Sequence, residues 1–148
     1  DYYENSGEGL PHYVNMLAAR GYVYGEHWAP HDIRVRELGT GKSRLEAAAS
    51  LGLKFSVGRN LGLEEGIHAA RLFFKRCYFD EEKTLRGRET LQHYRRDYNS
   101  RLREFKATPV HDWASHGADA FRGLAVRHKV PVRKRAAEPD YKPTGVWS

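Results

Sequence analysis

Cysteine is almost absent from this sequence, and no long apolar run occurs in it. The single thiol, Cys77, has no second cysteine for an internal disulfide, and one thiolate is too few for a cysteine-rich zinc site. No segment approaches the roughly 20 apolar residues that a membrane-spanning helix needs. The opening DYYENSGEG also lacks a signal-peptide pattern. We therefore expect a reducing, intracellular setting and no membrane as a partner.

Positive charge, by contrast, is in excess. The 148 residues carry a net charge of +6, and 40% of them are hydrophobic, which is enough for one compact domain with a core. The excess favours a polyanionic partner, although high solubility is the simpler explanation. Basic residues and three prolines gather after residue 128. We therefore predict a folded domain over 1–128 and a basic, proline-containing C-terminal tail over 129–148.

Hydrophobic periodicity alternates along the chain between helix-like and strand-like segments. A helix is predicted from Leu10 to Leu17 with Gly21 ending it, and Pro30 is expected to stop the strand that follows. Strands are predicted at 1–3, 22–28, 53–57 and 77–79, and further helices at 45–51, 63–74 and 81–98. This alternation predicts an α/β domain with a largely parallel portion.

The stretch HDWASHGADAFRGLA, residues 111–125, concentrates acids and histidines at the predicted start of another helix. Ser115 is the predicted N-cap, because its hydroxyl can accept hydrogen bonds from unpaired N–H groups of the first turn. Asp119 would then lie near the helix N-terminus, where the helix dipole favours a carboxylate that faces a metal or phosphate site. The simpler interpretation is an early-helix acid flanked by capping or surface histidines.

Asp32 is the most suitable partner for Asp119. It follows the predicted strand 22–28, at the edge where ligands bind in open α/β sheets. Carboxylate oxygens suit Mg²⁺ or Mn²⁺. Two such ions, about 3.5–4 Å apart, can activate a water and stabilise the leaving oxygen in phosphodiester cleavage. Asp112 is the first candidate for a third ligand, ahead of the acids near the N-terminus.

A basic, glycine-interrupted segment follows Asp32. Its sequence GTGKS is reminiscent of a phosphate-binding loop, but Arg36 stands where that loop needs a glycine, so we reject a nucleotide site. The cations of this segment could instead hold a DNA backbone, or they could form a solvated basic loop. They are Arg34, Arg36, Lys42 and Arg44.

Two other metal sites are less favoured by the histidine pattern. The pairs His31–Asp32 and His111–Asp112 suggest a metal phosphohydrolase of the kind built in an all-helical domain, but the first pair follows a predicted strand. A zinc site from His111 and His116 lacks thiolate ligands and also lacks the four-residue spacing of an H-E-x-x-H helix.

Three separated segments together resemble the C-terminal nuclease domain of the large terminase subunit of tailed bacteriophages and prophages. They are DYYENSGEGLPHYVNMLAARGY, YGEHWAPHDIRVRELGTGKSRLEAA and HDWASHGADAFRGLAV, in the order of that family, and the resemblance covers about residues 1–126. It implies an RNase H-like fold, in which a mixed central sheet is flanked by helices and an acidic cluster binds two divalent metal ions. It also implies cleavage of concatemeric double-stranded viral DNA, beside a separate ATPase domain that drives translocation.

The resemblance also assigns site residues by position. Asp32 looks like the second metal-binding acid of the family, and Asp119 looks like the last one. The first acid belongs to an Asp-x-Gly segment on the first strand, which this sequence does not contain, and Asp1 belongs to a later strand. We therefore expect an RNase H-like domain that lacks its first strand, with weak or absent activity in isolation.

The leading hypothesis is therefore a metal-dependent DNA endonuclease, with His116 or Asp112 orienting a metal ligand or handling a proton and the basic segment positioning the DNA backbone. The expected partners are double-stranded DNA, the terminase ATPase domain, the portal and the small terminase subunit. The expected location is the host bacterial cytoplasm, transiently at the procapsid portal. The alternative is a non-catalytic DNA-binding or portal- or ATPase-docking module that acts through the basic residues 127–135.

Overall fold

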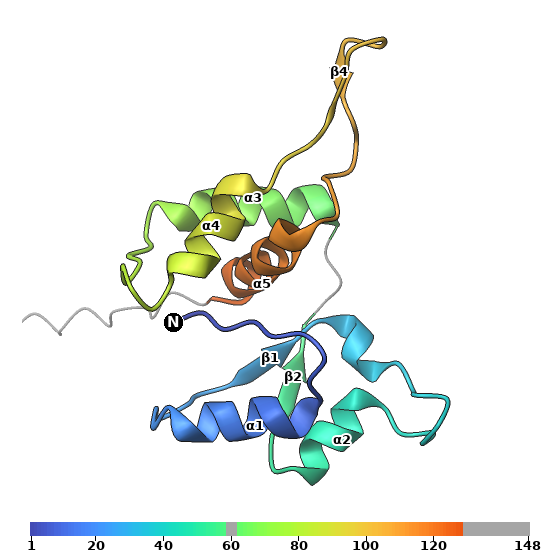
Figure 1. Ribbon diagram of the computed structural model, residues 1–148, viewed down its shortest axis with the longest axis vertical. Helices are drawn as coiled ribbons and strands as arrows, with labels where there is room; N and C mark the ends of the chain where they lie inside the picture. Colours follow the sequence, from blue (N-terminus) through green and yellow to red (C-terminus); the bar gives the residue numbers. More distant parts are fainter. Residues whose placement is uncertain (59–61, 129–148) are drawn as a thin grey trace, which may run out of the picture.

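The chain folds into two lobes, as the computed structural model shows for residues 1–58 and 62–128 (Figure 1). The first lobe holds α1 (Leu10–Ala19), β1 (His27–Ala29), the 3-10 helix η1 (His31–Arg34), α2 (Arg44–Ser50) and β2 (Phe55–Val57). The second lobe holds α3 (Leu63–Phe74), α4 (Leu85–His93), β3 (Tyr98–Asn99), β4 (Glu104–Phe105) and α5 (Trp113–Arg127). The predicted mixed α/β class is confirmed, and the tail predicted over 129–148 lies outside the described residues.

Local sequence signals set the ends of the helices in the first lobe. Gly21 follows α1 with a φ of 66°, a conformation that glycine adopts without a steric penalty. A capping box begins α2: the Glu46 backbone N–H donates to Ser43 Oγ at 3.1 Å, and the Ser43 N–H donates to Glu46 Oε2 at 2.7 Å. The helices predicted at 10–17 and 45–51 are therefore confirmed, with small shifts at their ends.

A two-stranded parallel sheet forms the centre of the first lobe. His27 of β1 lies opposite Phe55 of β2, and the two strands run together for three residues each. Both strands are shorter than the predicted 22–28 and 53–57. Pro30 follows β1 directly, and because proline has no N–H for a further ladder bond, the chain turns into η1 there.

Helix α5 is the central element of the second lobe and packs against both α3 and α4. The Phe121 ring of α5 lies 4.6 Å from the ring of Phe74 and 5.8 Å from that of Phe73, between ring centroids. Ala114 and Ala118 of the same helix are buried. Within 1–58 and 62–128, no helix is both long enough and apolar enough to cross a bilayer.

Two short strands predicted from the sequence do not form. Residues 77–79 have no strand partner, and they lead instead into a turn in which Asp80 Oδ1 accepts from the Lys83 N–H at 2.8 Å. Residues 1–3 are extended but unpaired in a sheet; the Tyr2 N–H donates to Lys83 O at 3.0 Å. Tyr2 packs against Gly87 of α4 and Phe79 lies 6.1 Å from the Phe74 ring of α3, whereas Tyr78 is fully exposed.

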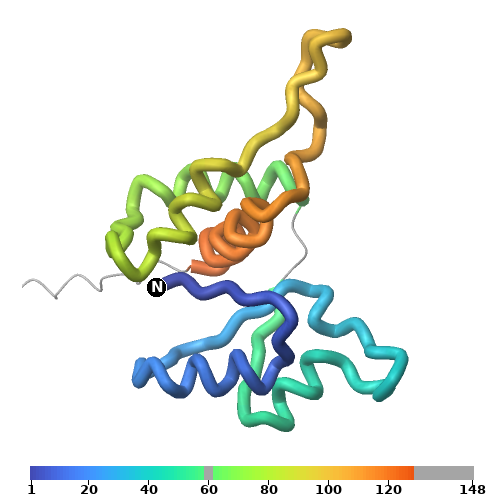
Figure 2. Tube along the Cα trace, in the orientation of Figure 1, coloured from blue at the N-terminus to red at the C-terminus, as the bar shows by residue number. Residues whose placement is uncertain are grey.

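The long helix predicted over 81–98 is replaced by the shorter α4 and a projecting hairpin (Figure 2). Tyr98 of β3 lies opposite Phe105 of β4, and the Lys106 N–H donates to Asp97 O at 2.9 Å. The chain leaves the helix because residues 95–99 pair with residues 104–110. Helical spacing alone does not reveal such a pairing.

The N-terminal segment connects the two lobes. Tyr2 packs against Gly87 of α4, where a side chain would collide with the tyrosine ring. The Tyr2 hydroxyl donates to Glu4 at 2.7 Å, and Glu4 accepts from Arg86 Nε at 2.6 Å. Burial, followed by the Glu4 carboxylate, raises the pKa of Tyr2 to about 12, so the hydroxyl remains a donor at neutral pH.

A glycine-to-alanine pair tests the packing of α5. A Cβ at Gly117 would overlap the hydroxyl of the fully buried Thr90, whose Oγ1 donates to Gly87 O at 2.7 Å. We expect Gly117→Ala to destabilise the fold by about 1–3 kcal/mol, the usual cost of overpacking. Thermal and chemical unfolding followed by circular dichroism would measure the change.

Gly123→Ala in the same helix is the matched control. Its Cβ would meet only the end of the flexible Arg127 side chain, at 2.9 Å. Alanine favours the helix over glycine by up to about 1 kcal/mol, so this variant should be neutral or more stable. Equal effects of the two substitutions would contradict the close α4–α5 contact.

Candidate functional site

A large open pocket of about 1180 Å³ lies between β1 of the first lobe and α5 of the second. Asp32, from η1, and Asp119, from α5, both line it. The two acids are distant in the sequence, and the fold brings them to one cavity. Histidines from both lobes, His31 and His116, line the same pocket.

Asp32 reaches the pocket because of the chain reversal after β1. Pro30 ends the strand, and η1 begins at the next residue with the Ile33 N–H donating to Pro30 O at 3.2 Å. Asp32 is exposed, whereas Ile33 beside it is buried and anchors the turn. The predicted position at the end of the strand is confirmed.

Asp119 lies further along its helix than predicted. The helix begins at Trp113, so Asp119 belongs to its second turn and not to its N-terminus. The prediction that the helix dipole acts directly on this carboxylate is therefore wrong, because that effect falls off within the first turn. Asp119 Oδ1 instead pairs with Arg122 Nη2 at 3.0 Å, one helical turn onward.

Asp112, and not Ser115, is the N-cap of α5. Its Oδ1 accepts from the Ala114 N–H at 2.9 Å, while the Ser115 hydroxyl donates to Asp112 O at 2.7 Å from within the helix. The Ser115 prediction is wrong because Asp112 occupies the capping position three residues earlier. A carboxylate in this place also gains from the unpaired N–H groups of the first turn.

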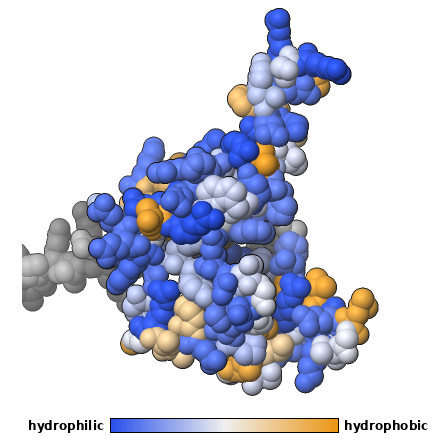
Figure 3. Space-filling model, viewed as in Figure 1, coloured by the Kyte–Doolittle hydropathy of each residue, from blue (hydrophilic) through white to orange (hydrophobic). Residues whose placement is uncertain are grey.

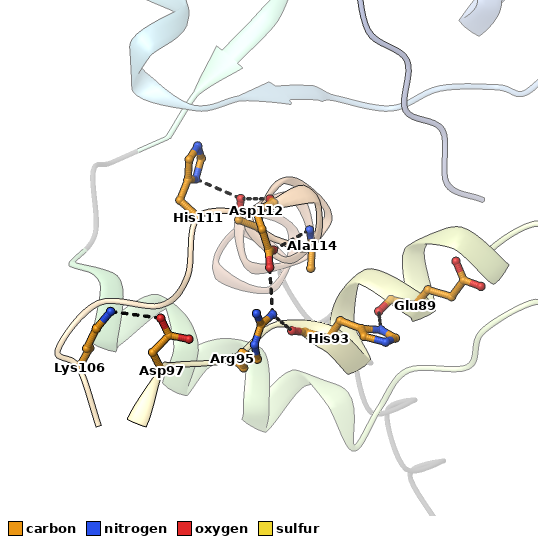
Figure 4. A network of polar contacts seen from close by, with 9 residues as sticks. Glu89, His93, Arg95, Asp97, Lys106, His111, Asp112 and Ala114 are labelled. Atoms are coloured by element: carbon orange, nitrogen blue, oxygen red, sulfur yellow. Dashed lines mark hydrogen bonds and ion pairs between the residues drawn. The ribbon is translucent and has the colours of Figure 1, made fainter. Parts of the chain in front are cut away.

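The second carboxylate oxygen of Asp112 binds the base of the hairpin (Figure 4). Arg95 Nη1 donates to Asp112 Oδ2 at 2.9 Å. The hydrogen bond from Ala114, followed by the Arg95 guanidinium, holds the pKa of Asp112 below its usual value. Asp112 does not line the pocket that holds Asp32 and Asp119. Its contacts are those of a structural cap, and they give no support to its assignment as a third metal ligand.

His116 is exposed at the rim of the pocket, one turn before Asp119. Its ring lies 5.4 Å from the ring of His111, edge to face. The Ser115 hydroxyl lies 3.1 Å from His111 Nδ1, which fixes the orientation of that second ring. Of the two neighbouring histidines His111 and His116, only His116 lines the pocket, as His31 does from the first lobe.

Three carboxylates line the pocket, those of Glu26, Asp32 and Asp119, but they do not form a metal centre. Among residues 1–58 and 62–128, no group of three or more histidine, cysteine, aspartate or glutamate side chains is arranged to hold a metal ion. Asp32 and Asp119 supply oxygen ligands of the type that Mg²⁺ and Mn²⁺ prefer, but two ligands leave most of either ion's coordination positions to other groups.

The predicted basic cluster spans the end of η1, the exposed loop that follows it and the start of α2. Arg36 pairs with Ser43 across this loop, and its Nη1 donates to Gly41 O at 3.2 Å. Arg44 lies 3.5 Å from Glu37. All four predicted cations, Arg34, Arg36, Lys42 and Arg44, are exposed. They lie within one segment next to Asp32, and DNA binding by them stays a prediction.

Two arginines near the pocket were not predicted as residues of the metal site. Arg122 lines the pocket beside Asp119, and the spacing of these two residues by three positions in a helix could have revealed the pair. Arg127 crosses to the first lobe, where its guanidinium lies 5.6 Å from the Trp28 ring and 3.4 Å from Ala29 O. No local sequence pattern indicates this second contact, because it depends on how the lobes meet.

Comparison with protein-family models, with curated proteins and with solved structures gave no match to this chain. The functional interpretation therefore depends on the residues and their geometry.

Substitutions at Asp112 separate a capping role from a metal-binding one. Asp112→Ala should lower the melting temperature more than Asp112→Asn, because asparagine keeps an acceptor at the N-cap. The pKa of Asp112 is lowered in the folded state, so its stabilisation is present above the ordinary value of 3.8 and is lost as the pH falls through the folded value. The difference between wild type and Asp112→Ala should therefore shrink in acid. Circular dichroism melts across that range would measure it, and an unchanged melting temperature at neutral pH would contradict the capping role.

Proposed function

We propose that this chain is the RNase H-like nuclease domain of a large terminase subunit, and that it cleaves concatemeric double-stranded DNA with divalent metal ions. The observation that supports this proposal most directly is the shared pocket of Asp32 and Asp119. The sequence resemblance independently assigns metal binding to the same two acids. The parallel pair β1–β2 and the flanking helices are compatible with this fold class.

The pocket contains the types of residue that metal-dependent hydrolysis uses. Asp32 and Asp119 would hold Mg²⁺ or Mn²⁺ through their carboxylate oxygens. Two bound ions would activate a water and stabilise the leaving oxygen of the phosphodiester. His116, at the rim, is placed to orient a ligand or to accept a proton from a group in the pocket. The exposed basic loop would hold the DNA backbone without reading sequence.

The proposed site needs at least one further acidic metal ligand. The family that the sequence resembles places a further acid in an Asp-x-Gly segment, and none of the 148 residues forms such a segment. We propose that this acid completes the site beside Asp32 and Asp119. In the whole terminase, the ATPase domain, the portal and the small subunit would be the protein partners, in the host bacterial cytoplasm and transiently at the procapsid portal.

Plasmid nicking in Mn²⁺ tests the proposal. The assay compares this chain with a version extended upstream through an Asp-x-Gly strand. We expect the extended protein to nick DNA, and Asp32→Asn or Asp119→Asn to lower its rate by about 100-fold or more, because a bound metal contributes several kcal/mol of transition-state stabilisation. Gel analysis of supercoiled, nicked and linear forms gives the rates.

Glu81→Gln is the matched control for these substitutions. Glu81 is an exposed acid in the segment before α4 and does not line the Asp32–Asp119 pocket, so its substitution should leave nicking unchanged. Full activity of Asp32→Asn and Asp119→Asn in the extended protein would show that these acids are not the metal ligands.

A non-catalytic DNA-binding or docking module is the alternative function. The lack of a three-ligand group within the described residues favours it, as does the exposed basic loop. Such a module would bind DNA with a steep salt dependence and with no metal requirement. Nicking that depends on Mn²⁺ and on Asp119 would exclude this alternative as the sole function.

A further inference from the structure

The β3–β4 hairpin forms an arm that stands away from the second lobe (Figure 2). We define the arm as residues 95–106. Each of its limbs extends over at most about 20 Å, the reach of six extended residues. The arm has five basic and two acidic residues, and the face of it that Figure 3 shows is mostly hydrophilic. Three large hydrophobic side chains of the arm, Tyr98, Leu102 and Phe105, are also exposed.

The arm is braced at its base and along its length. Arg95 pairs with the cap residue Asp112 at 2.9 Å, and Lys106 pairs with Asp97 at 3.2 Å. Near the base, Arg96 pairs with Glu64 of α3. These contacts engage three of the five cations of the arm in ion pairs near its base.

The two remaining cations lie at the tip. Arg101 and Arg103 belong to the turn between β3 and β4, where Asn99 Oδ1 accepts from the Arg101 N–H at 3.1 Å. Both side chains are exposed, and neither forms an ion pair with any residue of the described ranges. Glu104 is the nearest acid in sequence. It lies opposite Asn99, so alternation along the strand directs it to the face away from Tyr98 and Phe105.

A hollow with a largely apolar lining lies at the base of the arm, and three of its arginines, Arg95, Arg96 and Arg122, are paired with acids. It has a volume of about 510 Å³, and its lining includes Phe105 together with four arginines and one acid. The charged residues are Arg71, Arg95, Arg96, Arg122 and Glu64. Ala118 and Phe121 of α5 line this hollow, whereas His116 and Asp119 line the large pocket, and Arg122 lines both.

We propose that the tip of the arm, through the exposed side chains of Arg101 and Arg103, binds the phosphate backbone of duplex DNA. A two-stranded ribbon is narrow enough to enter the major groove of B-form DNA. Arg101 and Arg103 then contact phosphates, which fixes the position of the duplex without selecting a sequence. The inference rests on the proposed function because it takes duplex DNA as the ligand.

The test measures duplex binding in EDTA, where cleavage does not interfere. The double variant Arg101→Ala/Arg103→Ala should bind more weakly, and the plot of log K against log salt should become shallower by about 2, since each lost phosphate contact removes about 0.9 from the slope. Arg101→Lys/Arg103→Lys keeps both charges and should keep the wild-type slope. The charge-matched control is Lys75→Ala/Arg76→Ala, at the far end of α3, which should also keep it.

The outcomes separate this inference from the proposed nuclease function. A shallower salt dependence in Arg101→Ala/Arg103→Ala alone supports DNA binding by the arm, whether or not the extended protein nicks plasmid in Mn²⁺. An unchanged slope in that variant contradicts DNA binding by the arm, even if nicking depends on Asp119. Equal losses in the arm variant and the Lys75/Arg76 control, or no DNA binding by the wild-type chain, also overturn it.

Discussion

The close contact between Gly117 of α5 and Thr90 of α4 is the constraint on which the second lobe depends. Thr90 is fully buried, and its hydroxyl is held by Gly87 O, so it cannot move away from the helix that crosses it. This approach fixes the rotation of α5. One face of α5 then turns Phe121 toward α3, and another turns Asp119 toward the first lobe.

Much of the helical structure could be predicted because its signals are local. Ser43 and Glu46 are three positions apart and cap α2 directly, and Gly21 ends α1 through its own backbone conformation. The hairpin could not be predicted in this way. Its formation depends on Tyr98 meeting Phe105, and helical spacing of apolar residues before position 98 gave a plausible but wrong continuation of α4.

The candidate site shows the same division between local and distant information. The sequence identified Asp32 and Asp119 as a pair, and the fold places both on one pocket. It also named Asp112 as a metal ligand, although a carboxylate before a helix suits capping as well as metal binding. Only the contacts with Ala114 and Arg95 distinguish these roles. A motif thus predicts which residue types are available, whereas orientation determines their use.

The ion pair between Asp119 and Arg122 bears on how a divalent ion could enter the pocket. Both side chains are partly exposed, 46% for Asp119 and 27% for Arg122. A pair of this kind contributes only about 0–1 kcal/mol, because water screens the charges. A divalent cation carries twice the charge of the guanidinium and can approach the carboxylate more closely. The pair can therefore orient Asp119 in the absence of metal without preventing metal from binding to it.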